Sequence, residues 1–483
     1  MVVIGAGLGG LTSAARLSQA GRRVLLLEQH HIPGGCATTF QRGKHKFEVG
    51  LHALNGFLPN DPRLSMWQEL GLDSALKLIL LPMQYRVIWR DFDLRIPHGT
   101  KACIEAFSRC FPQERHNLKI YFSNLMALIK PILNSEANFK DLLNAGRLSA
   151  GEFLDQHFSD AKLKLLLLAN LGYYHHDPYN LSLLWFAFGQ MSYMDGGSYY
   201  IQGGSQKLSD TLAQRVLKSG TIVYRATATD ILTKDEQITG VRFFHKGDCV
   251  TVNTKCVIAG ISPLLVAKML KEDSLIKSLT SKREIGPSLS ALYCNHETGL
   301  KSLGWQDYNT IFLNEKIPGI DAHIHKELQK IQNRGLDSLG FSLIDYSQIE
   351  HGLGKSNPFT LCHLDRIQDW PTYKSPEYQI QKARHKDSLL QKLKPWFGDI
   401  TPSHGELATP HTIQHYTQNP EGAVYGYAQT ISQSMFLRFN HRCSLPNLWF
   451  ASAWSRPGGG FFGAMYGGWQ VAGKCLDQKA AIT

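Results

Sequence analysis

The chain has 483 residues, of which 43% are hydrophobic and 19% charged, a composition typical of globular proteins and unlike that of disordered chains. At roughly 100 to 200 residues per domain, this length predicts several structural units. The net charge of +11 reflects 51 basic and 40 acidic residues, and the basic residues are scattered except for a cluster at residues 42–46. A nucleic-acid interface needs a basic stripe with interleaved aromatic residues, so we expect no nucleic-acid partner.

Cysteine spacing and hydropathy exclude further classes. The nine cysteines form no Cys-x-x-Cys pair and no zinc-finger pattern, so we expect neither a disulfide framework nor a metal site. No window reaches the roughly 18 consecutive apolar residues that a membrane-spanning helix needs. No basic leader with a cleavage site precedes the first apolar run, which predicts a cytoplasmic protein without a signal peptide.

The first thirty residues predict a strand, a glycine turn, a helix and a second strand that ends in an acid. Val2–Ile4 and Val24–Leu27 are short apolar runs typical of buried parallel strands. Leu11–Ala20 has the apolar periodicity of a helix, and Gly21 predicts its end. Glu28 follows the second strand, 18 residues after the last glycine of the turn. This order and spacing form the dinucleotide-binding fingerprint.

Each part of that fingerprint has a physical role. Gly5 permits the tight turn, Gly7 lets the backbone approach a pyrophosphate, and Gly10 allows the helix to pack closely on the strand. The helix N-terminus binds the phosphates through free N–H groups and its positive dipole end. Glu28 accepts hydrogen bonds from the ribose hydroxyls. The predicted binding segment is Gly5, Ala6, Gly7, Leu8, Gly9 and Gly10.

A second glycine pair, Gly34 and Gly35, lies six and seven residues beyond the acid. A plain NAD domain does not need this pair. The combination resembles the extended FAD signature of the glutathione-reductase-type proteins, in the amine-oxidase-like branch with phytoene desaturases, carotenoid isomerases and retinol saturases. The resemblance implies non-covalent FAD, contacted also by Gln29.

The resemblance continues in three later segments. Residues 201–205 (IQGGS) look like the family's glycine element, although Ile201 stands where the family has Pro. The segment 226–231 looks like the family's hairpin beside the adenine, which implies backbone contacts at Ala228. Residues 409–426 and 447–460 are similar to retinol saturases and carotenoid isomerases in particular. Glu48 stands where the family has Asp. Residues 100–190 and 300–400 show no resemblance.

The end of the chain predicts a helix over Phe461–Gln470, directly after three glycines. The resemblance implies that this helix N-terminus points at the flavin N1 and C2 carbonyl, where its dipole stabilises the reduced ring. The predicted contacts are Gly458, Gly459, Gly460 and Phe461.

We expect an α/β fold with a discontinuous Rossmann-like FAD-binding domain, a helical insert and a mixed α+β substrate domain. The FAD-binding parts are expected at 1–99, 196–286 and 406–483, the insert at 100–195 and the substrate domain at 287–405. Within residues 62–95, Leu78–Leu81 and Tyr85–Trp89 are interpreted as strand-like runs separated by turns, and 376–394 is interpreted as a helix.

Few residues indicate the chemistry itself. His52 and Tyr425 are the candidates for proton delivery, with packing or hydrogen bonding favoured for His52. Cys36 beside the second glycine pair is interpreted as a packed thiol. His175 and His176 are interpreted as a solvated turn, because adjacent histidines diverge. The aromatic residues between 185 and 200 suit either the core or an apolar tunnel equally.

The leading hypothesis is an FAD-dependent oxidoreductase of an apolar polyene or isoprenoid-like substrate, by saturation, desaturation or isomerisation. An amine or protoporphyrinogen-type oxidase on the same fold is the alternative. A flavin-free lipid escort like the Rab GDP dissociation inhibitor is a third hypothesis, which the complete glycine set argues against. No NADPH-specific site is evident. We expect peripheral contact with an anionic membrane through residues 100–190; the oligomeric state stays open.

Overall fold

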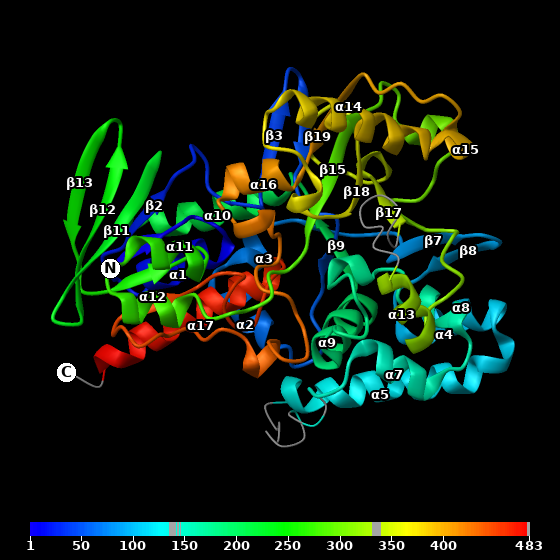
Figure 1. The fold of residues 1–483 in the computed structure, drawn as a ribbon, viewed down its shortest axis with the longest axis horizontal. Helices are drawn as coiled ribbons and strands as arrows, with labels where there is room; N and C mark the ends of the chain where they lie inside the picture. Colours follow the sequence, from blue (N-terminus) through cyan, green and yellow to red (C-terminus); the bar gives the residue numbers. More distant parts are fainter. Residues whose placement is uncertain (135–141, 143, 145, 331–339, 481–483) are drawn as a thin grey trace.

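The computed structural model describes residues 1–134, 142, 144, 146–330 and 340–480. At its centre is a parallel sheet in the order β10-β2-β1-β14-β20 (Figure 1). Its members are β10 (Thr221–Tyr224), β2 (Leu25–Glu28), β1 (Val2–Ile4), β14 (Val257–Ala259) and β20 (Leu448–Phe450). The three middle strands are short runs of Val, Ile, Leu and Ala and are almost entirely buried, as expected for a sheet covered on both faces.

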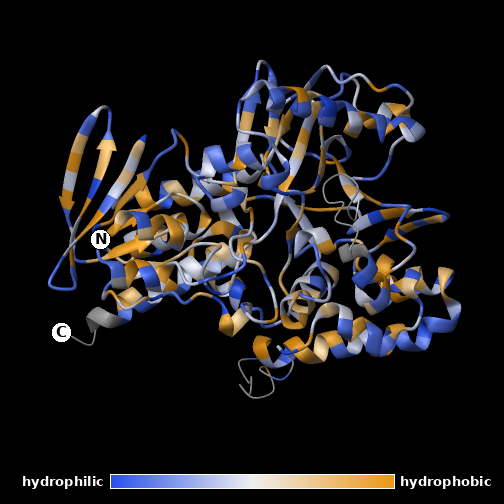
Figure 2. Cartoon of the chain, in the orientation of Figure 1, coloured by the Kyte–Doolittle hydropathy of each residue, from blue (hydrophilic) through white to orange (hydrophobic). Residues whose placement is uncertain are grey.

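Three helices pack together beside this sheet: α1 (Leu8–Gln19), α10 (Ser205–Leu217) and α17 (Phe461–Ala480). The sheet and these helices share one buried apolar cluster, and Figure 2 shows this region as strongly hydrophobic. Gly473 of α17 faces Arg16 of α1, whose Nη1 donates to the Trp469 carbonyl oxygen at 2.7 Å. The two ends of the chain therefore form one packed unit.

An antiparallel sheet of β11 (Ala226–Lys234), β12 (Gln237–His245) and β13 (Asp248–Asn253) extends from the edge of this unit (Figure 1). It is followed by α11 (Pro263–Met269) and α12 (Asp273–Leu279). The hairpin predicted around Ala228 is present, and Ala228 pairs with Phe243.

A mixed sheet of seven strands forms the second half of the molecule, in the order β19-β15-β18-β17-β16-β7-β8. Its strands are β7 (Tyr85–Trp89), β8 (Phe92–Ile96), β15 (Ser288–Asn295), β16 (Asn309–Leu313), β17 (Gly340–Asp345), β18 (Pro358–Asp365) and β19 (His404–Ala408). The helices after β16 and β18 are α13 (Ala322–Lys330), α14 (Pro376–Gln391) and α15 (Lys394–Phe397).

This sheet differs from the expected division of the chain at residue 99. β7 pairs with β16 in a parallel ladder in which Val87 lies opposite Ile311, and β8 pairs with β7, so residues 85–96 belong to this sheet rather than to the parallel sheet. The helices α2 (Pro62–Glu69) and α3 (Leu72–Ala75) lie where turns were expected, and the strand expected at Tyr85–Trp89 is present as β7. The strand expected at Leu78–Leu81 is present as β6 (Leu78–Leu80), which pairs with β9 (Ser198–Ile201), as does β5 (Leu54–Asn55).

The segment expected as a helical insert contains α4 (Thr100–Cys110), α5 (Arg115–Leu133), α7 (Ala150–His157), α8 (Ala161–Leu167) and α9 (Leu183–Met194). These helices share a large apolar core with β7, β8 and β16. Residues 135–141, 143 and 145 of this segment, and 331–339 of the expected substrate domain, lie outside the described residues. Among the described helices, none is long and apolar enough to cross a bilayer.

Candidate functional site

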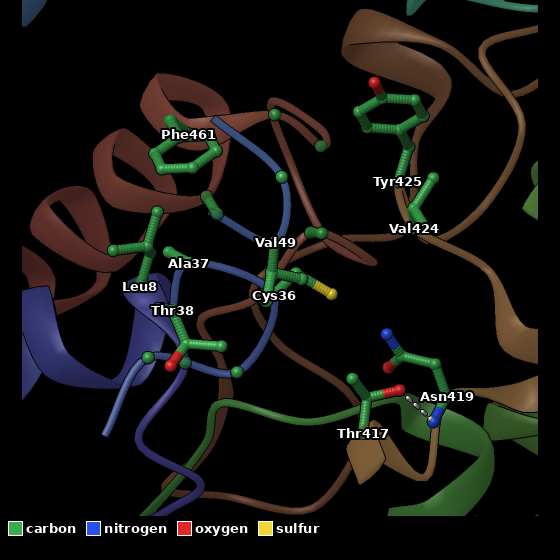
Figure 3. Close-up of a pocket in the computed structure, with 18 of the residues that line it drawn as sticks. Leu8, Cys36, Ala37, Thr38, Val49, Thr417, Asn419, Val424, Tyr425 and Phe461 are labelled. Atoms are coloured by element: carbon green, nitrogen blue, oxygen red, sulfur yellow. Dashed lines mark hydrogen bonds between the residues drawn. The ribbon is translucent and has the colours of Figure 1, made fainter. Parts of the chain in front are cut away.

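One continuous cavity of ≈ 1450 Å³ runs from the carboxyl ends of β1 and β2 to the seven-stranded sheet and α9. Figure 3 shows Leu8, Ala37 and Phe461 on one side of it and Val424 and Tyr425 on the other, with the Cys36 sulfur pointing into the space between. The predicted site residues that line it are Gly5, Gly7, Leu8, Gly9, Glu28, Gln29, Gly34, Gly35, His52, Ala228, Tyr425, Gly459, Gly460 and Phe461.

The glycines of the first turn have two different roles. A Cβ atom on Gly10 would lie 2.0 Å from the Gly5 carbonyl oxygen, and one on Gly9 would lie 2.1 Å from that of Ala451. These positions need glycine because the backbone packs against them. A Cβ on Gly7 would meet no protein atom within 4 Å. The open space at Gly7 is therefore what a bound pyrophosphate requires, and the fit of a dinucleotide is good at this point.

The start of α1 is free to bind an anion. Gly7 is its N-cap, no side chain caps the helix, and the first turn contains no acidic residue. Gly34 lies beside it, because its N–H donates to the Ala6 carbonyl oxygen at 2.8 Å and it forms a parallel bridge with Gly7. With φ at +128° and its Cβ position 2.3 Å from the Ala37 carbonyl oxygen, Gly34 also requires glycine. The two glycine segments thus form one backbone surface.

Glu28 lies at the end of β2 and is buried. One carboxylate oxygen accepts the Ala6 N–H at 2.7 Å and the other accepts the His30 N–H at 2.8 Å. Burial raises the pKa of the Glu28 carboxyl, and these backbone donors act against that effect. Each carboxylate oxygen has lone pairs for two hydrogen bonds, so acceptor capacity remains for ribose hydroxyls on the cavity side.

Three predicted cofactor residues do not line the cavity: Ala6, Gly10 and Gly458. Ala6 is buried and positions Glu28 through its N–H. A Cβ on Gly458 would lie 2.1 Å from Gln429 Nε2, so this glycine serves packing. Gly459 and Gly460 do line the cavity, and the Ala464 N–H donates to the Gly460 carbonyl oxygen, so Gly460 directly precedes α17 as its N-cap.

His52 is buried against the inner part of the cavity. Its Nδ1 lies 3.4 Å from the Tyr173 hydroxyl and 3.9 Å from Cys362 Sγ, whereas its Nε2 has no hydrogen-bond partner in the described chain. Burial lowers the pKa of His52 to about 4. The imidazole is therefore neutral at pH 7, and its Nε2 is buried without a partner among the described residues.

The other two titratable candidates are also held in their neutral forms. Burial raises the pKa of the Tyr425 phenol and raises that of the Cys36 thiol to about 11. Cys36 is thus a protonated thiol, in agreement with the packed role expected from the sequence. Arg438, which the sequence did not single out, donates to the backbone carbonyls of Tyr425 and Ala453 and positions these loops.

The inner part of the cavity is lined mainly by apolar and aromatic side chains. Of the aromatic segment 185–200, Trp185, Phe188 and Tyr193 line the cavity, whereas Phe186 and Tyr200 are buried in cores. Both interpretations of that segment therefore hold for different members. The lining residues that sequence reasoning missed include Ala169, Gly172, Tyr173, Tyr174, Ile311, Leu313, Phe341 and Cys362. They come from helices and strands far apart in the sequence and carry no shared motif.

Glu48 and His175 have structural roles. Glu48 is buried and accepts the N–H and the hydroxyl of Ser205 at 2.7 and 2.6 Å, which fixes the start of α10. The interpretation of His175 as part of a solvated turn is wrong. Its side chain is fully buried, its Nδ1 accepts the Asp177 N–H at 3.0 Å, and burial lowers its pKa to about 4. Packing onto the fold excludes water from His175, whereas His176 is exposed.

Comparisons with known proteins agree with this geometry. Residues 8–290 match the family model of flavin-containing amine oxidoreductases. The all-trans-retinol 13,14-reductase of Danio rerio is 24% identical over 474 residues, which cover 88% of this chain and 77% of the reductase. The 4,4'-diaponeurosporene oxygenase of Staphylococcus aureus is 23% identical over 517 residues, which cover 99% of this chain and 98% of the oxygenase.

A solved structure extends the agreement to the fold. Cyclohexylamine oxidase from Brevibacterium oxydans superposes with a TM-score of 0.63 at 15% sequence identity, covering 99% of each chain. The predicted fold class and the resemblance to the desaturase and saturase branch are both confirmed.

Proposed function

Because the chain belongs to the family of flavin-containing amine oxidoreductases and binds FAD non-covalently, we propose that it saturates or isomerises C=C bonds, or forms them by desaturation, in an apolar polyene or isoprenoid-like substrate. The observation that carries this proposal is the continuous cavity. Its cofactor arm, lined by Gly5, Gly7, Glu28 and Gly34, opens into a substrate arm lined by aromatic and aliphatic side chains such as Trp185, Phe188, Ile311 and Phe341. An extended apolar molecule is the ligand that such an arm stabilises by burial.

In this proposal the two glycine turns and Glu28 hold the dinucleotide part of FAD, and Ala228 contacts its adenine. Gly459, Gly460 and Phe461 place the start of α17 at the flavin end, where free N–H groups favour negative charge. Bound FAD supplies the group that exchanges a hydride or electrons with the substrate. The apolar walls align the chain and exclude water.

Proton handling falls to groups that are neutral at pH 7. His52 presents its unpartnered Nε2, and the buried phenol of Tyr425 keeps its proton. His52 accepts or donates a hydrogen bond without becoming an imidazolium, which agrees with a positioning role. Tyr425 is the candidate proton donor.

The alternative, an amine oxidase, is favoured by fold likeness to cyclohexylamine oxidase. It requires recognition of an ammonium group before its deprotonation. Among the described cavity-lining residues of the seven-stranded sheet, Glu406 of β19 is the one carboxylate, and it is paired with Arg42 at 2.7 Å. Since an amine would find no unpaired carboxylate on that sheet, the polyene assignment is the better supported.

The decisive experiment is anaerobic mixing of the reduced holoprotein with a carotene, retinol, a prenyl lipid and an aromatic amine, and of the oxidised holoprotein with the same panel. Flavin absorbance and product masses are followed. We expect spectral change and product with one of the apolar compounds. Turnover of the amine without change in any polyene would overturn the substrate class and leave FAD binding intact.

We extend the proposal to substrate supply from a membrane surface. Within the helical segment, α5 exposes Ile120 next to the exposed cation Lys119, a combination that suits peripheral contact. Flotation with anionic liposomes at low salt is expected to carry the protein upward. Failure to float would contradict this extension alone.

A further inference from the structure

Two histidines and an aspartate converge between the seven-stranded sheet and α14. His363 and Asp365 lie at the end of β18, and His385 lies on α14, which crosses this part of the sheet in Figure 1. Their potential ligand atoms all lie within 4.8 Å of one another. His363 and Asp365 are 4% and 5% exposed, and His385 is half-buried. We call these three residues the His363 cluster.

The hydrogen bonds of His363 show which of its ring nitrogens carries the proton. Its Nδ1 lies 2.8 Å from the Leu364 carbonyl oxygen, which only accepts, so Nδ1 carries the proton. In the neutral ring the lone pair is therefore on Nε2, which accepts a hydrogen bond from Nε2–H of His385 at 2.8 Å. A bound ion would take the place of this proton, and neutral His385 would then carry its proton on Nδ1. A histidine whose outer N–H donates to a backbone carbonyl while the other nitrogen faces further ligands has the arrangement of a metal-binding histidine.

Asp365 is held equally firmly. One oxygen, Oδ2, accepts from the Ser290 hydroxyl at 2.5 Å and from Trp370 Nε1 at 2.9 Å. The other, Oδ1, accepts the Arg366 N–H at 2.8 Å. A carboxylate oxygen has two acceptor positions, so Oδ2 is saturated and Oδ1 retains one free lone pair. The carboxylate is oriented by donors outside the cluster, as ligating carboxylates commonly are.

We propose that the His363 cluster is a binding site for a divalent transition-metal ion of the zinc type, with two imidazole nitrogens and Asp365 Oδ1 as ligands. Tetrahedral zinc with Zn–N bonds of about 2.0 Å separates two nitrogens by about 3.3 Å. The observed 2.8 Å between the two Nε2 atoms widens to this value through a small rotation of the His385 side chain. Water or a fourth donor completes the coordination.

The metal would join α14 to the cavity wall. His363 borders the cavity, and its neighbour Cys362 contacts His52 across the same wall. A bound ion therefore fixes the strand that faces the proposed substrate without taking part in the flavin chemistry. Zn²⁺ binding at the His363 cluster does not depend on which substrate occupies the cavity, so it can be tested separately from the polyene assignment.

The test uses chelator-treated holoprotein from which the chelator has been removed, titrated with Zn²⁺ by calorimetry. We expect one site that is lost in His363→Asn and His385→Asn and retained in the control His116→Asn, which changes an exposed histidine outside the cluster. Ser290→Ala removes only an outer donor to Asp365 and is expected to weaken Zn²⁺ binding about 10- to 100-fold.

The location is checked by anomalous scattering at the zinc edge from crystals of the holoprotein soaked in Zn²⁺. A peak between the three ligand atoms supports the proposal. Absence of that peak, or Zn²⁺ binding that His363→Asn, His385→Asn and Ser290→Ala leave unchanged, overturns it. Flavin absorbance of each variant confirms that the fold is intact, and Ser290→Ala keeps the test valid if a histidine variant fails to fold.

Discussion

The two sheets that border the cavity are built in different ways. The first part of the parallel sheet, β1, α1 and β2 with the glycine turn, is formed by residues close in sequence, so that Gly5, Gly10 and Glu28 meet within one strand-turn-helix-strand unit. The other strands of that sheet, β10, β14 and β20, join this unit from far along the chain. The seven-stranded sheet joins segments that lie far apart, and β7 pairs with β16 across more than two hundred residues. The first glycine turn is therefore fixed by local backbone geometry, and the substrate arm by long-range packing.

The largest effect in this comparison is expected at Gly10. Gly10→Val places side-chain atoms against the Gly5 carbonyl oxygen, 2.0 Å from the Cβ position, where the backbone of the turn has no room to move. We expect a loss of about 3 kcal/mol or more in the free energy of unfolding, with little soluble protein. Soluble yield and thermal unfolding measure it. A variant as stable as the wild type would refute the tight packing of this turn.

Gly7→Val should separate cofactor binding from folding. Gly7 has φ −69° and ψ 170°, which valine adopts without strain, and its Cβ position meets no protein atom within 4 Å. We expect a folded protein that lacks FAD, because the side chain occupies the space of the pyrophosphate. Flavin absorbance per folded chain and circular dichroism check it, with wild-type apoprotein as the control. Full flavin occupancy would contradict the assignment.

These two glycines also show what the sequence could predict. The fingerprint, its helix and the distinct roles of Gly7 and Gly10 follow from local spacing, and the structure bears out the Gly10 packing. The membership of residues 85–96 in the second sheet depends on pairing with β16, for which no local pattern exists. The burial of His175 likewise depends on packing by distant segments. The lining of the substrate arm could not be predicted from the sequence, because its residues come from many elements that meet only in the folded chain.

A buried neutral histidine makes the free energy of unfolding depend on pH, and a variant of His175 in the helical segment tests this effect. Its pKa is lowered from 6.5 to about 4 in the folded protein, so the unfolded chain binds more protons between these values. The contribution of His175 to the free energy of unfolding is then constant above pH 7 and becomes unfavourable as the pH drops from 6.5 to 4. His175→Asn keeps an acceptor for the Asp177 N–H and should reduce that fall by up to about 3 kcal/mol.

Urea unfolding of wild type and His175→Asn at pH 7.5 and 4.5 measures the difference. His116→Asn is the matched control, since His116 is exposed and its removal should leave the pH dependence unchanged. An equal loss of stability in all three proteins on acidification would show that His175 does not contribute.

The smallest effect is expected at Cys36, where the two arms meet. Burial raises the pKa of this thiol to about 11, so it stays protonated at pH 8. Cys36→Ala should leave turnover within about twofold, and iodoacetamide should modify the exposed Cys110 and Cys249 first. Peptide mass mapping after brief labelling checks this. Fast labelling of Cys36, or a large loss of turnover, would assign it a chemical role.

The central claim is that one cavity holds FAD in its cofactor arm and the apolar substrate in its substrate arm, and a variant at Gly172 tests this claim most directly. Gly172 lines the substrate arm, and the nearest atom to its Cβ position is Leu364 Cγ at 3.8 Å, so Gly172→Leu fills this arm without a backbone clash. The measurement is the single-turnover rate between flavin and the polyene identified for the wild type. We predict full flavin content and a rate about 100-fold lower. An unchanged rate with bound flavin would contradict the account.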